Sequence, residues 1–61
     1  MKELVNYRKA IGKTQKEMAE LLGVSISMYT KYEYGLYKPS LKVIKKFREV
    51  FSDFDINIFL K

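Results

Sequence analysis

The chain has 61 residues, enough for one domain with a small core and near the lower limit for folding without disulfides, metals or a partner. It contains no cysteine and no histidine, so disulfides, thiol nucleophiles, imidazole bases and the usual zinc ligands are absent. We therefore expect a single domain over residues 1–61 that is not an enzyme, with no metal site, no cofactor and no small-molecule ligand.

Charge and hydropathy narrow the choice of partner. Twelve Lys and Arg against seven Asp and Glu give a formal net charge of +5 and an isoelectric point near 9.6, which favours polyanions. Apolar residues make up 48% of the chain but never form the run of roughly twenty that a membrane span requires. The first residues lack a secretory pattern, and we expect a cytoplasmic protein with no membrane partner.

The first half of the chain predicts two short helices. The first covers residues 2–11, and Gly12 is expected to end it in the left-handed conformation. The second begins at Thr14, which forms a capping box with Glu17, and ends at Gly23. The expected inner faces are Leu4, Tyr7, Arg8 and Ile11 on the first helix, and Met18, Ala19 and Leu22 on the second.

A third helix is predicted over residues 26–34, with the Ser25 hydroxyl as its N-cap. Only Tyr29 and Tyr32 fall on a plausible core stripe, and Gly35 closes the helix. Most of this helix therefore faces outward, which is unusual in so small a protein. The predicted outer residues are Ile26, Ser27, Thr30, Lys31 and Tyr34.

The last third predicts a fourth helix over residues 41–51, capped by Ser40, and a single final turn that starts at Asp55. The basic side of the fourth helix is either a solvated surface or a second nucleic-acid surface. The expected buried residues are Leu41, Ile44, Phe47 and Phe51 on the helix, and Ile56, Phe59 and Leu60 on the turn.

Residues 15–34 carry the most specific pattern. Two helices that meet steeply through a short turn need a small residue where their backbones approach and a glycine in the turn. Ala19 and Gly23 occupy these places. The run from Thr14 to Gly35 resembles the helix-turn-helix core of the phage repressor and Cro-like family, also called Xre-like regulators. The likeness extends to Arg8, to residues 38–41 and to the ending 55–60.

The resemblance implies a compact all-α domain of five helices that binds a double-stranded DNA operator and regulates transcription as a repressor or Cro-like protein. It also implies roles for particular residues, carried over by position. Arg8 and Glu33 match a structural ion pair of the family. Base-reading positions correspond to Ser25, Ile26, Ser27, Met28, Thr30 and Lys31. Phosphate-binding positions correspond to Gln15, Lys16, Tyr34, Tyr37 and Lys38.

The chain departs from the family at Ile26, where many relatives have arginine or glutamine. Isoleucine cannot make the bidentate contacts that read guanine or adenine, although it can pack on a thymine methyl group. The resemblance therefore does not predict the operator sequence.

A homodimer on a roughly palindromic site is expected, because one small module buries too little surface for tight and selective binding. Phe54 and Ile58 are the expected interface residues, since neither has an obvious place in the core. The alternative is a protein-binding module of the same fold, such as an antitoxin or anti-repressor. Its docking surface would consist of Ile56, Ile58, Phe59 and Leu60.

Overall fold

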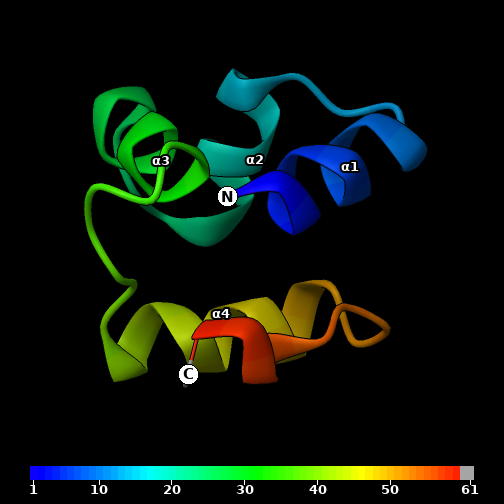
Figure 1. Cartoon of the computed structure of the whole chain (residues 1–61). Coiled ribbons are helices and arrows are strands. Elements are labelled where there is room, and N and C mark those ends of the chain that lie inside the picture. Colours follow the sequence, from blue (N-terminus) through cyan, green and yellow to red (C-terminus); the bar gives the residue numbers. More distant parts are fainter. Residues whose placement is uncertain (60–61) are drawn as a thin grey trace.

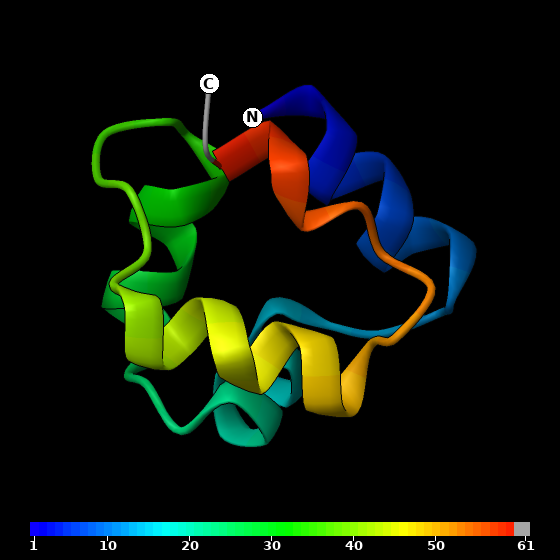
Figure 2. The same ribbon diagram turned by 90° about the horizontal axis from the view of Figure 1, so that it is seen from below.

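The computed structural model describes residues 1–59. It comprises α1 (Lys2–Ala10), α2 (Gln15–Leu22), α3 (Ile26–Glu33), α4 (Leu41–Val50) and a final 3-10 turn, η1 (Ile56–Phe59), and the described residues contain no strand. Helices α1 to α3 form one level, and α4 with η1 forms a second level, joined to the first by the loop of residues 34–40 (Figure 1). Seen from below, α4 and η1 lie in front of the other helices (Figure 2). The predicted all-α architecture is confirmed.

Polar side chains fix the helix starts as predicted. The Thr14 hydroxyl accepts a hydrogen bond from the Glu17 backbone amide at 3.1 Å, and the Glu17 carboxylate accepts one from the Thr14 amide at 2.9 Å. Ser25 and Ser40 cap α3 and α4 in the same way, each accepting from the amide three residues later. These contacts satisfy amides that lack a partner within the helix.

The turn between α2 and α3 depends on a glycine. Gly23 has a φ of +71°, and its amide donates to the Glu20 carbonyl while the Val24 amide donates to the Ala19 carbonyl. This pair of bonds is a Schellman motif, which requires the left-handed conformation that glycine adopts without strain. The turn reverses the chain over a few residues, so that α3, which begins at Ile26, packs against α2.

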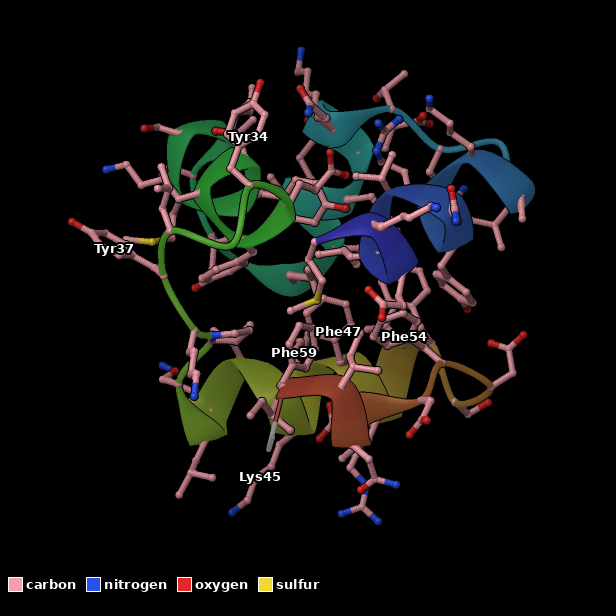
Figure 3. The ribbon with its side chains drawn as sticks, in the orientation of Figure 1. Tyr34, Tyr37, Lys45, Phe47, Phe54 and Phe59 are labelled. Atoms are coloured by element: carbon pink, nitrogen blue, oxygen red, sulfur yellow. The ribbon has the colours of Figure 1, made fainter. Side chains whose placement is uncertain are left out.

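The core lies between the two levels. Met18, Ala19 and Leu22 of α2 and Tyr29 and Tyr32 of α3 are buried as predicted. On the other side, the Phe47 ring centroid lies 5.4 Å from that of Phe54 and 5.1 Å from that of Phe59. Figure 3 shows these three phenylalanines between α4 and the upper helices.

Two residues predicted to lie on inner faces are instead exposed. Leu41 is 73% exposed, whereas Val43, which was not among the expected inner residues, is buried. Each residue turns a helix by about 100°, so the centre of the Ile44 and Phe47 stripe lies nearer Val43 than Leu41. Ile11 is 36% exposed; it is the C-cap of α1, at the very end of the helix.

The expectation that Phe54 lacks a place in the core is wrong. Its side chain is only 9% exposed and its ring centroid lies 4.8 Å from that of Tyr7. The Phe54 amide donates to the Phe51 carbonyl, and this turn directs the side chain back into the core. The nearby Asp53 carboxylate accepts a hydrogen bond from the Tyr7 hydroxyl, which ties the turn to α1.

The final turn is also mostly a core element. Phe59 is buried, while Ile56 and Ile58 are half-buried and pack against the core. Asp55 accepts a hydrogen bond from the Asn57 amide at 3.0 Å, as expected of a cap. Leu60 lies outside the described residues. None of the helices among residues 1–59 has the length and apolar character needed to cross a membrane.

Candidate nucleic-acid interface

Helix α3 has one buried side and one outward side. Tyr29 and Tyr32 face the core, whereas four residues one turn apart or less point away from it. We refer to these four as the outer face of α3: Ile26, Ser27, Thr30 and Lys31. Ile26 is 45% exposed and Ser27 is exposed, while Thr30 and Lys31 are half-buried.

Some of the predicted base-reading side chains are already engaged in hydrogen bonds or packing within the protein. The Ser25 hydroxyl accepts from the Met28 amide at 3.1 Å, and the Thr30 hydroxyl donates to the Ser27 carbonyl at 2.8 Å. Met28 is half-buried and packs against the core. Among the predicted set, the side chains of Ile26, Ser27 and Lys31 are therefore the best placed to meet an external partner.

Three helices meet at one buried carboxylate. Arg8 of α1 donates to Glu33 Oε2 at 2.6 Å, and its Nη1 donates to the Lys13 carbonyl. The hydroxyl of Tyr29 donates to the same carboxylate oxygen at 2.7 Å, and Gln15 Nε2 donates to Glu33 Oε1 at 3.0 Å. The geometry thus contains the predicted contact between Arg8 and Glu33 and adds two donors that the sequence reading missed.

Of the two additional donors to Glu33, only Tyr29 could have been predicted from sequence spacing. Tyr29 and Glu33 are four residues apart on α3, a spacing that brings side chains together on one helix face. Gln15 belongs to a different helix, so only the angle between α2 and α3 brings it to the carboxylate. The sequence carries no local signal for that second contact.

The pKa values follow from this network. Burial alone would raise the pKa of the Glu33 carboxyl, but the hydrogen bonds from Arg8, Tyr29 and Gln15 lower it below its usual value. Hydrogen bonding to Glu33 raises the pKa of the Arg8 guanidinium, and burial raises that of the Tyr29 hydroxyl. Glu33 is therefore charged and Tyr29 neutral near pH 7, which suits a fixed structural junction.

The predicted phosphate-binding residues lie at the start of α2 and in the loop after α3. The Gln15 to Glu33 hydrogen bond links these regions, because Tyr34 directly follows Glu33. Lys16, Tyr34, Tyr37 and Lys38 are exposed, and Gln15 is half-buried. Figure 3 shows Tyr34 and Tyr37 pointing outward, away from the phenylalanine core.

The basic residues of α4 are also exposed, but they do not all face one way. Lys45 points away from the molecule on the side opposite Tyr34 (Figure 3). Lys42, Lys46 and Arg48 are also exposed, and Lys46 Nζ lies 4.0 Å from a Glu49 carboxylate oxygen. Lys42 and Lys46 line a shallow pocket with Gly23 and Val24 of the α2–α3 turn, whereas Lys45 faces away from it.

Helix α2 ends in a glycine turn, and α3 follows at once and presents its outer face away from the core. This arrangement defines a helix-turn-helix domain. The sequence model of the helix-turn-helix family matches residues 4–53. The chain belongs to this family, and its predicted kinship with phage repressors and Cro-like proteins is confirmed.

One similar curated protein is the transcriptional repressor RstR of the cryptic phage CTXphi from Vibrio cholerae serotype O1. The two sequences are 46% identical over 43 residues, which is 70% of this chain and 38% of that repressor. The aligned region thus spans well under half of the relative. No solved structure matches the chain significantly.

Proposed function

We propose that this protein binds double-stranded DNA sequence-specifically and regulates transcription as a repressor or Cro-like protein. The observation that carries the proposal is the two-sided character of α3. Because Tyr29 and Tyr32 are buried, Ile26, Ser27 and Lys31 face outward together. A helix of this kind fits the major groove, where the donors and acceptors of all four base pairs differ.

The residues on either side of α3 supply the complementary backbone contacts. Gln15 lies at the start of α2, where exposed helix amides also favour an anion. Lys16, Tyr34, Tyr37 and Lys38 provide further exposed donors and positive charge. Phosphate contacts of this kind supply affinity and fix the orientation of the protein, while the base contacts supply discrimination.

A homodimer on a roughly palindromic operator remains part of the proposal. A domain of this size covers too little DNA for selective binding by itself. Half-sites separated by about 34–36 Å would place both copies of α3 on one face of the duplex. Since Phe54 belongs to the core, the half-buried Ile58 is the remaining interface candidate of the two.

The test is a titration of fluorescent duplex DNA at several salt concentrations, with wild type and Lys38→Ala. We expect log Kd to rise steeply with log salt concentration for wild type. The variant should bind all sequences more weakly, with a slope shallower by about one, because one phosphate contact is lost. Weak binding without salt dependence in the wild type would contradict the proposal.

The described residues of the docking surface expected for a protein-binding module are not free to bind a partner. Phe59 is buried, and Ile56 and Ile58 pack partly against the core, so these side chains do not form a free apolar patch. If the titration shows no binding to DNA, a protein-binding function would have to use other exposed residues.

A further inference from the structure

The end of α3 is folded back on itself by a second glycine turn. Gly35 has a φ of +73°, its amide donates to the Tyr32 carbonyl at 3.1 Å, and the Leu36 amide donates to the Lys31 carbonyl at 2.9 Å. These two bonds form a Schellman motif. The loop therefore leaves α3 alongside its last turn, and Tyr37 comes next to Lys31.

The two side chains meet directly. Lys31 Nζ lies 5.0 Å from the centroid of the Tyr37 ring, within the range of a cation–π contact. The ring is 53% exposed and points outward from the loop (Figure 3), whereas Lys31 is half-buried. Tyr37 is thus an exposed platform beneath one residue of the outer face of α3.

We propose that Tyr37 is a positioning residue for base recognition, which holds the Lys31 ammonium over its ring before DNA is bound. The proposal rests on the proposed function, since it assigns a role within the same DNA-binding surface. A lysine side chain has many rotamers, and fixing it in one of them costs conformational entropy. Holding Lys31 in the free protein lowers the part of this cost that falls on DNA binding.

The contact leaves Lys31 able to bind. An ammonium group has three N–H donors, and a ring face takes up only one side of it. The remaining donors are available to guanine O6 and N7 in the major groove. Tyr37 therefore contributes to sequence preference through Lys31, separately from any phosphate contact made by its own hydroxyl.

Two substitutions separate the ring from the hydroxyl. Tyr37→Phe keeps the ring and loses the hydroxyl, whereas Tyr37→Leu loses both and keeps an apolar side chain. Leu36→Ala is a matched control, because this neighbouring side chain is 66% exposed and the bond of its backbone amide to Lys31 is retained.

The experiment measures competition between the duplex that wild type selects and duplexes with single base-pair changes, at fixed salt. Lys31→Ala identifies the base pairs that Lys31 reads. We expect Tyr37→Leu to reduce preference at those same base pairs by about two- to fivefold, the size of an exposed cation–π contact. Tyr37→Phe and Leu36→Ala should keep the wild-type preference, and Tyr37→Leu should add nothing in the Lys31→Ala background.

Proton NMR of the DNA-free protein provides a second readout. The Lys31 ε-methylene protons should be shifted upfield by the ring in wild type and Tyr37→Phe, and not in Tyr37→Leu. Absence of that shift in wild type would overturn the proposal, as would an unchanged base preference in Tyr37→Leu. Equal weakening on every sequence in Tyr37→Leu and Tyr37→Phe would instead assign Tyr37 to phosphate binding alone. If wild type itself shows no preference, the proposed function fails and this role falls with it.

Discussion

Gln15, the first residue of α2, donates a hydrogen bond of 3.0 Å to the carboxylate of Glu33, the last residue of α3. The contact joins the proposed phosphate-binding end of one helix to the junction that holds the other. It gives Gln15 a structural role in addition to the expected DNA contact.

Gln15→Ala should therefore affect both stability and binding. We expect a loss of about 1.5–3 kcal/mol in the free energy of unfolding, because a hydrogen bond to a charged group is removed. DNA affinity should fall about equally on specific and random sequences. Urea melts and titrations measure the two effects. Lys16→Ala, an exposed change on the same helix, is the control and should unfold within about 0.5 kcal/mol of wild type.

The Arg8 and Glu33 pair should show strong coupling. Each single alanine variant leaves the other charge without its partner at a site where the side chains are only 15% and 4% exposed, and should cost about 3–5 kcal/mol. The double variant should lose less than the sum of the two singles. Melts of the four proteins measure the coupling. The exposed Lys46 and Glu49 pair supplies a comparison cycle that should be additive, and strict additivity in both cycles would remove the ion pair from this account.

Acid should weaken the same junction. Hydrogen bonds hold the folded-state pKa of Glu33 below the ordinary value of 4.5, so the carboxylate stabilises the fold at pH above that value. The stabilisation is lost as the pH falls through the folded-state pKa. The decrease in unfolding free energy between about pH 6 and pH 3 should therefore be larger for wild type than for Glu33→Gln. Equal decreases in the two proteins would show that Glu33 does not titrate as the structure implies.

Phe54 and Leu41, whose burial differs from the expectation, can be compared by the stability of their alanine variants. Phe54→Ala should cost about 3–5 kcal/mol, because a buried ring in contact with other rings is removed. Leu41→Ala should stay within about 0.5 kcal/mol, since Leu41 is exposed. Chemical denaturation measures both. A small effect at Phe54 with a large one at Leu41 would restore the original assignment of the core.

Local patterns predicted the elements of this fold well. The Thr14 and Glu17 capping box, the Ser25 and Ser40 caps and the Gly23 turn could all be predicted, because each depends on residues within five positions of one another. Assignments that depend on the direction in which an element packs were less secure. Leu41 and Val43 both lie beside the stripe on α4, and the position of the neighbouring helices decides which is buried.

The candidate site divides in the same way. The outward position of Ile26, Ser27 and Lys31 followed from the burial of Tyr29 and Tyr32 on the same helix. The contact between Lys31 and Tyr37 did not, because it requires the path of the loop after Gly35. Sequence spacing indicates which residues share a helix face, but contacts between separate segments require the tertiary structure.

The central claim is that the outer face of α3 reads DNA bases, and selection of binding sites from random duplexes tests it most directly. Wild type, Ser27→Ala and Lys31→Ala are compared at fixed salt, with melts to verify that stability is unchanged. Each lost base contact should reduce discrimination by about 1–3 kcal/mol and relax preference at one or two base pairs in each half-site. An identical sequence preference in all three proteins would contradict the account, because α3 would then not be the helix that reads the operator.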